Sequence, residues 1–370
     1  MKFTINKDVI LEGLNSVIKA ISTNNIIPVL NGIKLELSKK GLFLLASDGE
    51  LTIKVLIPNK DILKIENEGS IVIQSKFILD ILRKMPSEVI NFEVLDGLKI
   101  MIYTDNNQFN LNCMDPSDYP QIKIEESKEP VNIDAEVFKN VINQTSFAIS
   151  NQELRPLLTG INLKINGDIL ECVATDSYRL AKKHIKLDQT FNNNIDIVIP
   201  GRSIIELEKI LTTDNLEIHV FNNKVLFKYK NVLFQSNLLN GTYPNTSNLI
   251  PKEFSFIIKV NTDEFRSSVD RAALLTQGKD KNIVNMLVDN KILTTSASSE
   301  LGKVEEKINI ESNNKDKLKL SYSSKYMLEA LKTLKEEELL IMLNSDTKPI
   351  ILKSVKDESL IQLILPIKTY

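Results

Sequence analysis

The stretch IPVLNGIKL at residues 27–35 is followed by LLASD at residues 44–48, and both return later in the chain. Their second copies are RPLLTGINL at 155–163 and CVATD at 172–176. Gly32 and Gly160 are 128 positions apart, and so are Asp48 and Asp176. A fainter third copy runs from IVNMLV at 283–288 to TSAS at 295–298. Repetition on this scale indicates one structural unit used three times.

Turn-forming pairs recur with the repeats and separate apolar runs, as hairpins require. The first set is Lys40-Gly41, Asn166-Gly167 and Asp289-Asn290, and the second is Asp96-Gly97, Asn222-Asn223 and Ser345-Asp346. Residues around these turns alternate between polar and apolar, as in half-buried antiparallel strands. The repeat-equivalent Asp48 and Asp176 are expected to serve the same hairpin turn in two units.

Each unit also contains two helical patterns. The first helices are predicted to begin near Asp8, Asp134 and Thr262, all acceptable N-cap residues. The second helices are predicted at residues 75–85, 201–211 and 324–334. We therefore predict an α+β fold of three similar domains, at residues 1–128, 129–252 and 253–370. Each domain should hold two helices packed on antiparallel sheet.

Composition sets limits on function. The hydrophobic fraction is 42%, the charged fraction is 25% and the net charge is −2. These values fit an ordinary globular protein and argue against a generally basic nucleic-acid binder. No apolar run reaches the length of a membrane span, and the N-terminus lacks a signal-peptide core, so we expect a cytoplasmic protein. Cys113 and Cys172 are expected to be reduced, structural thiols.

Positive charge is placed more regularly than composition shows. Each second helix carries a basic, an acidic and a basic residue at positions i, i+4 and i+7, which share one helical face. The sets are Lys76-Asp80-Arg83, Arg202-Glu206-Lys209 and Lys325-Glu329-Lys332, with Lys139 and Arg266 in neighbouring turns. One alternative is a solvated face of salt-bridged charges. The other is a mildly positive wall that attracts phosphates without contacting bases.

No arrangement of residues points to catalysis, a metal or a cofactor. The chain has two histidines, His184 and His219, and no nucleotide-binding loop or catalytic motif. A hydrolase that uses Asp176 with His184 is a weak alternative, since no third group completes the set. We predict that the protein is not an enzyme.

The motifs ATDSYRLA at 174–181 and QLILPIKTY at 362–370 resemble the bacterial β sliding clamp family, the processivity factors of the replicative DNA polymerase. KFTI at 2–5, IPVL at 27–30 and the threefold repeat extend the resemblance over the whole chain. It implies a closed ring of two chains joined head to tail, which encircles duplex DNA and slides on it. The basic residues named above would face the DNA.

The resemblance also implies two protein-binding surfaces. In the ring interface, Phe109 and Leu111 on an edge strand would meet Leu274 and Leu275 of the second copy. Intradomain core is the alternative for these four residues. A groove for short Leu- and Phe-bearing peptides of polymerase, clamp loader and other partners would be lined by Leu158, Thr175, Ser177, Tyr178, Arg179, Leu180, Pro244, Asn248, Leu249, Leu363, Leu365, Pro366, Ile367 and Lys368.

Two alternatives stay open at this stage. Without the resemblance, residues 365–367 fit a terminal edge strand that packs on its own sheet. A repeat-built interaction scaffold with no DNA role fits the same repeats. Tyr178, Asn248 and Lys368 differ from residues common in the family, which affects expected partner selectivity rather than the groove itself.

Overall fold

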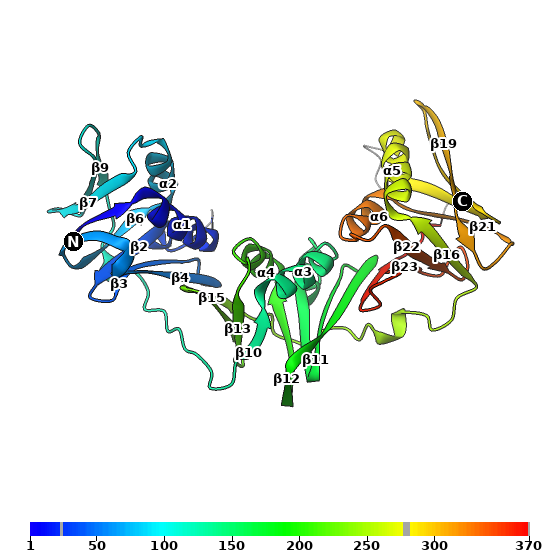
Figure 1. Ribbon diagram of the computed structural model, residues 1–370, viewed down its shortest axis with the longest axis horizontal. Coiled ribbons are helices and arrows are strands. Elements are labelled where there is room, and N and C mark those ends of the chain that lie inside the picture. Colours follow the sequence, from blue (N-terminus) through cyan, green and yellow to red (C-terminus); the bar gives the residue numbers. More distant parts are fainter. Residues whose placement is uncertain (23–24, 277–281, 369–370) are drawn as a thin grey trace. The chain divides into compact units, whose positions relative to one another are not determined.

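The computed structural model, drawn in Figure 1, describes residues 1–22, 25–276 and 282–368. The chain divides into two compact units. Unit 1 consists of Met1–Glu136 and Lys209–Leu238, and unit 2 of Val137–Glu208 and Leu239–Tyr370. The described strands pair antiparallel throughout, and helices pack on the sheets, so the predicted α+β class is confirmed.

Unit 1 contains two sheets, ordered β5-β1-β7-β8-β9 and β10-β13-β14-β15-β4-β3-β2-β6. Its helices are α1 (Lys7–Val17) and α2 (Ser75–Lys84). Its strands are β1 (Lys2–Asn6), β2 (Gly32–Ser38), β3 (Gly41–Ser47), β4 (Leu51–Pro58), β5 (Ile62–Asn67), β6 (Gly69–Gln74), β7 (Val89–Leu95), β8 (Lys99–Tyr103), β9 (Gln108–Asn112), β10 (Val131–Asp134), β13 (Asn215–Val220), β14 (Lys224–Tyr229) and β15 (Val232–Asn237).

Unit 2 contains sheets ordered β11-β12-β24-β23-β22-β16-β20 and β19-β18-β17-β21. Its helices are α3 (Ala135–Ser146, entering from unit 1), α4 (Gly201–Glu208), α5 (Thr262–Ala273) and α6 (Ser324–Leu331). Its strands are β11 (Gly160–Thr175), β12 (Arg179–Pro200), β16 (Phe256–Asn261), β17 (Ile283–Asp289), β18 (Ile292–Ser299), β19 (Gly302–Asn309), β20 (Glu311–Ser312), β21 (Lys317–Ser323), β22 (Glu338–Leu343), β23 (Ile350–Ser354) and β24 (Leu360–Ile364).

The units cut through the middle repeat because sheets continue from one repeat into the next. In unit 1, β15 of the second repeat pairs with β4 of the first, and Phe234 lies opposite Ile53. In unit 2, β24 of the third repeat pairs with β12 of the second, and Gln362 lies opposite Ala181. All four side chains are fully buried, so each join is part of a core.

The six predicted helices are present, but the second helix of each repeat ends earlier than predicted, at Lys84, Glu208 and Leu331. Lys209 and Lys332 therefore lie just beyond α4 and α6, and the starts of the first helices also shift slightly. The cap of α1 is Asn6, so Asp8 lies in its first turn. The cap of α5 is Asn261, whose side chain accepts from the N–H groups of Asp263 and Glu264, because Thr262 is already helical. The apolar stripe of α1 is buried at Ile10, Leu14 and Val17 as its spacing predicts.

One predicted turn is wrong. Asn166 and Gly167 lie within β11 and not between two separate strands. The register with β12 shifts on both sides of Gly167, whose φ is +61°. A left-handed glycine serves a bulge as well as a turn, so the pair alone does not distinguish them. The other five predicted pairs lie at turns that join consecutive strands, although Gly41 is already the first residue of β3 and Asp289 is still the last residue of β17.

The repeated Gly32 and Gly160 are needed for close packing. A Cβ on Gly32 would lie 2.5 Å from Val72 Cγ1, and one on Gly160 would lie 2.5 Å from the Ile199 carbonyl oxygen. Both glycines begin the strand that follows the IPVL-type segment, so any larger side chain would force the two strands apart.

Candidate partner-binding site

The apolar floor of the candidate groove is a buried cluster in unit 2. Leu158 comes from a short 3-10 turn (Pro156–Thr159), Leu180 from β12 and Leu363 from β24. Leu180 and Leu363 lie opposite each other where the two strands pair. The cluster contains Leu158, Val173, Leu180, Val198, Tyr243, Ile351 and Leu363. Three of the predicted groove residues are therefore brought together, although their side chains form the base and are covered.

A tight turn at residues 176–179 forms one wall. Asp176 Oδ1 accepts from the backbone N–H groups of Tyr178 and Arg179, at 2.9 and 3.0 Å. Thr175 donates its hydroxyl to the Arg179 carbonyl at 2.6 Å, and its N–H donates to the Tyr243 hydroxyl at 3.1 Å. Ser177 has a φ of +77°, a left-handed conformation that L-residues adopt at a cost. Burial raises the pKa of the Tyr243 phenol, so the phenol stays neutral.

The rim of the site presents side chains to solvent. Tyr178 is 58% exposed and Leu365 is 38% exposed. The Leu365 N–H donates to the Tyr178 carbonyl at 2.8 Å, and the Ile367 N–H donates to the Ser321 carbonyl at 2.7 Å. Pro244, Asn248, Leu249 and Lys368 are exposed, while Pro366 and Ile367 are half-buried. A hollow of about 420 Å³ is lined by Lys319, Leu320, Ser321, Asp346, Thr347, Ile367 and Lys368.

The Arg179 side chain is largely buried and lines a further hollow of about 550 Å³ with Phe147 and Glu329. It is 6% exposed, and its guanidinium pairs with Asp176 Oδ2 at 3.0 Å and with the Glu329 carboxylate of α6. The guanidinium also lies 4.5 Å from the Tyr326 ring centre and 5.5 Å from that of Phe147. Burial raises the pKa of the Tyr326 phenol, and the Asp176 carboxylate adds to the shift. Sequence reasoning did not predict the roles of Glu329 and Tyr326 here.

The predicted DNA-facing residues are solvent-accessible in the unit that holds each. In unit 1, Lys76, Arg83 and Lys209 are exposed, and Arg83 donates to Asn15 Oδ1 at 2.7 Å. In unit 2, Arg202, Lys325 and Lys332 are exposed, while Lys139 and Arg266 are partly buried. Arg266 pairs with Asp263 at 2.7 Å. The acidic member of the α6 set, Glu329, pairs with Arg179 and not with a lysine of its own helix.

The predicted interface residues are accessible in both units. Phe109 is 38% exposed on β9, which is the last strand of its sheet, and Leu111 is half-buried there. Leu274 is 63% exposed, whereas Leu275 packs on the core of unit 2. Sequence reasoning missed Phe77 of α2, which is 48% exposed. It lines a hollow of about 310 Å³ with Ile73, Gln74, Asn110, Leu111 and Asn112.

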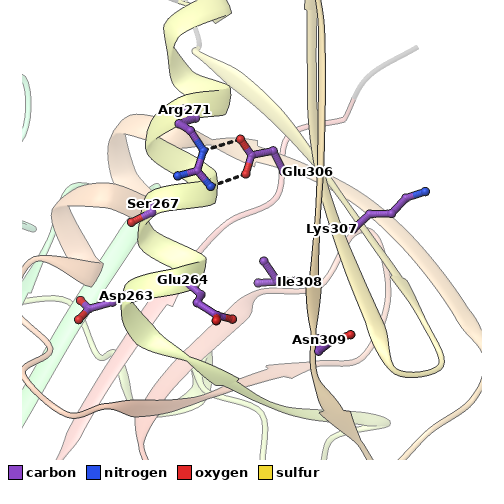
Figure 2. A pocket seen from close by; sticks show the side chains of 8 residues that line it. All are labelled: Asp263, Glu264, Ser267, Arg271, Glu306, Lys307, Ile308 and Asn309. Carbon is purple, nitrogen blue, oxygen red and sulfur yellow. Dashed lines mark hydrogen bonds and ion pairs between the residues drawn. The ribbon is translucent and has the colours of Figure 1, made fainter.

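Another hollow lies beside the edge strand β19 (Figure 2). Its volume is about 480 Å³, and its lining comes from α5 and β19. The Arg271 guanidinium of α5 reaches the Glu306 carboxylate of β19 through two nitrogens, as Figure 2 shows. Hydrogen bonds from Arg271 lower the pKa of the Glu306 carboxyl, so this ion pair is charged at neutral pH.

Three family models match the chain in succession. They describe the N-terminal, central and C-terminal domains of the DNA polymerase III beta subunit and match residues 1–123, 132–245 and 247–368. The chain belongs to the DNA polymerase III beta subunit family. The Beta sliding clamp of Bacillus subtilis is 40% identical over the full length of both chains, and that of Staphylococcus aureus is 37% identical.

Solved structures agree with this membership. The crystal structure of the Bacillus subtilis sliding clamp covers all of both chains with a TM-score of 0.95 at 40% identity. A beta chain from Streptococcus pneumoniae gives a TM-score of 0.94 at 32% identity over all of both chains. This beta subunit is therefore a sliding clamp of three similar domains and a DNA polymerase processivity factor, as the sequence predicted.

The described residues of this beta subunit contain one group of side chains close enough to hold a metal, Glu126, Glu217 and His219. The Lys228 ammonium already lies 2.7 Å from Glu126 and 3.6 Å from Glu217. The Ser127 N–H donates to His219 Nδ1 at 2.9 Å, so Nε2 carries the proton of the neutral ring and has no lone pair for a metal. The group therefore has a structural role: its hydrogen bond and ion pairs attach the segment around Ser127 to β13 and β14.

Other predicted features of the beta subunit have plain structural roles. Asp48 accepts from the N–H groups of Glu50 and Leu51, just as Asp176 does in its own turn, so the shared turn role is confirmed. Both cysteines are free, and burial raises the pKa of Cys113 to about 11. None of the described helices has the length and apolar character to cross a bilayer.

Proposed function

We propose that this processivity factor acts as a head-to-tail ring of two chains that encloses duplex DNA and presents one partner groove per chain. In this proposal the ring retains DNA by closure around it, since the net charge of −2 leaves little general affinity for phosphates. We also propose that the three domains span residues 1–128, 129–252 and 253–370. We further propose that the protein works in the cytoplasm, where bacterial DNA is replicated. In this proposal it has no catalytic activity of its own, and a separate ATPase loads it onto DNA.

The ring is supported by an equivalent hydrogen bond and an equivalent strand register in the two joins within the chain. In unit 1 the Asn237 N–H donates to the Glu50 carbonyl at 2.9 Å. In unit 2 the Leu365 N–H donates to the Tyr178 carbonyl at 2.8 Å. Glu50 and Tyr178 each lie two residues after the repeated aspartate. The joins are therefore two copies of one interface.

A third copy of the interface has both halves but no partner within its sheets. One free half is β9, the last strand of the first repeat, and it is equivalent to β15 and β24 in the other two repeats. The other free half is β19 of the third repeat, which follows β18 in the same way as β4 follows β3. Each is the edge strand of its sheet. Open edges pair with other strands unless they are protected. A second copy supplies the missing strand to each half, and the contact closes after two chains.

The joins also fix the expected register. Phe234 lies opposite Ile53 across the first join, and both are fully buried. Phe109 of β9 is equivalent to Phe234 of β15, because each occupies the same position in its hairpin. Val304 of β19 is equivalent to Ile53 of β4, because Val304 lies opposite Ala297 and Ile53 lies opposite Ala46. Phe109 should therefore meet Val304 of the second copy. This contact would bury a phenylalanine that is 38% exposed in the single chain.

Disulfide cross-linking tests the interface. Phe109→Cys with Val304→Cys, in a chain with Cys113 and Cys172 replaced by serine, should form a covalent dimer on mild oxidation. The matched control pairs Phe109→Cys with Glu306→Cys. Glu306 is two residues further along the strand than Val304, so the Cα atoms of the control pair would lie roughly 8 Å apart. A disulfide spans at most ~7 Å between Cα atoms. A control that links faster would reject this register, and a monomeric mass of the unmodified chain would reject the ring.

The positive residues provide a test against a scaffold without a DNA role. Reversal of Lys76, Arg202 and Lys325 to glutamate should weaken retention on nicked circular DNA, because repulsion replaces attraction to phosphates. A control reverses Lys60, Lys186 and Lys348, which are also exposed and change net charge equally. Equal loss in both variants would indicate a general charge effect, and no loss in either would favour the scaffold.

The groove is tested by truncation of the tail residues. Leu365→Ala with Ile367→Ala should abolish binding of a labelled Leu- and Phe-bearing peptide while the dimer mass stays unchanged. The matched control is Leu63→Ala with Ile65→Ala, two exposed apolar residues of β5 in unit 1. Peptide affinity that survives the tail variant would remove the groove assignment.

A further inference from the structure

The turn at residues 176–179 carries a buried cation where its counterpart in the first repeat is apolar. Leu51 follows Asp48 at the same distance as Arg179 follows Asp176, and Leu51 is 1% exposed. Both residues begin the strand that forms a join. Removing a guanidinium from water is costly unless opposite charges and hydrogen bonds replace the water.

The charges that compensate Arg179 come from two different elements. Asp176 belongs to the turn itself, whereas Glu329 lies on α6, which belongs to the third repeat. Tyr326, one turn earlier on α6, lies under the guanidinium and stacks on Tyr178 with ring centres 6.5 Å apart. Two side chains of α6 therefore support the backbone and the exposed ring of the turn.

This turn is also the point where the tail attaches. The Tyr178 carbonyl accepts the N–H of Leu365, and Leu365 is a proposed groove residue. The strained φ of +77° at Ser177 lies one residue earlier, so the turn has no preference of its own for this conformation. A change in the position of α6 would move the carbonyl, the Tyr178 ring and the start of the tail together.

We propose that Glu329 is a positioning residue for partner binding: its pair with Arg179 holds the groove wall, although Glu329 itself lies on the helix that begins with Ser324 and Lys325. The inference rests on the proposed groove. It assigns Arg179 a role in the support of the wall. It also gives the acidic member of the third helical set a function that its counterparts do not share.

Asp80 of α2 provides the matched control. It occupies the position of Glu329 in the first repeat, it is exposed, and it takes part in no ion pair within the described residues. Asp80→Asn and Glu329→Gln remove the same charge from equivalent helices. Only the second removes a partner of a buried cation.

The experiment measures binding of a fluorescein-labelled Leu- and Phe-bearing peptide to the dimeric protein. Glu329→Gln should raise the dissociation constant of the peptide about fivefold to tenfold, a range typical of coupling between connected sites. Asp80→Asn should leave affinity unchanged. In an Arg179→Leu background, which restores the residue of the first repeat, Glu329→Gln should have no further effect because the pair is already absent.

Two results would overturn the inference. One is wild-type affinity in Glu329→Gln with peptide binding otherwise intact. The other is equal weakening with and without Arg179, which would indicate that Glu329 acts through a general loss of stability. Failure of the groove itself gives a different result, because the wild-type protein would then not bind the peptide or would bind it without Leu365 and Ile367.

Discussion

The turns at residues 48–51 and 176–179 are two copies of one structure with different surroundings. In each, an aspartate side chain accepts from two backbone N–H groups, and a carbonyl two residues later receives the strand of the next repeat. The first turn has Gly49 and Leu51, whereas the second has Ser177 and Arg179. The first seals a join, and the second also presents Tyr178 to solvent.

The difference shows how a repeated joint acquires a binding role. Cluster residues in unit 1, among them Leu30, Val72 and Tyr119, have counterparts in Leu158, Val198 and Tyr243 below the candidate groove. The fold below the turn is therefore conserved between repeats within the chain. What changes is the turn itself, where a buried leucine gives way to a cation that must be held by α6.

Truncation of the buried residue should separate the two turns most strongly. Leu51→Ala removes a fully covered side chain and should lower the free energy of unfolding by about 3 kcal/mol through lost burial and a cavity. Replacement of the pair as a whole, by Arg179→Leu together with Glu329→Leu, should cost about 1 kcal/mol or less, since apolar replacement of both partners of a buried ion pair is often near neutral. Calorimetric unfolding of both variants measures the contrast. Similar losses would mean that the ion pair stabilises as Leu51 does.

Removal of the aspartates should give a smaller contrast in the same direction. Asp48→Ala leaves two backbone donors without an acceptor and should cost about 1 kcal/mol. Asp176→Ala also removes one of the two carboxylates around Arg179, so about 2 kcal/mol is expected. Asparagine variants keep the acceptor oxygen and isolate the charge. Asp176→Asn should then be more destabilising than Asp48→Asn, and the opposite order would contradict the role of the buried pair.

Repetition made most of the fold predictable. The helices, five of the six turns and the shared aspartate role follow from local spacing that the three copies reinforce. Asn166-Gly167 failed because a left-handed glycine is compatible with a bulge inside a strand. The joins between repeats were not predicted. Alternation of polar and apolar residues identifies a strand but does not show which other strand it pairs with, and the join depends on the pairing of β15 with β4.

The candidate site was predictable as a set of positions but not as a set of roles. The resemblance placed Arg179 among the groove residues, and the structure buries its side chain between Tyr326 and Phe147. One available clue was the contrast of Leu51 with Arg179 at equivalent positions. Glu329 belongs to the repeated charge pattern of the second helices, but its partner Arg179 lies 150 residues away, so helical spacing could not predict the pair.

The smallest expected effects come from exchange of the left-handed residues, and they oppose each other in sign. Ser177 has a φ of +77°, so Ser177→Gly should stabilise by about 0.5 kcal/mol, because glycine reaches this region without steric cost but gains more freedom when unfolded. Gly49 has a φ of +94°, and an added Cβ would meet nothing within 4 Å. Gly49→Ser should therefore cost about 1 kcal/mol through backbone strain alone. Loss of the hydrogen bond from Arg155 to the Ser177 hydroxyl, 3.2 Å long and exposed, subtracts little from the gain. If calorimetry showed that both exchanges destabilise the protein, the Ser177 side chain would stabilise the second turn by its own contacts. Backbone strain at Ser177 would then not explain the difference between the two turns.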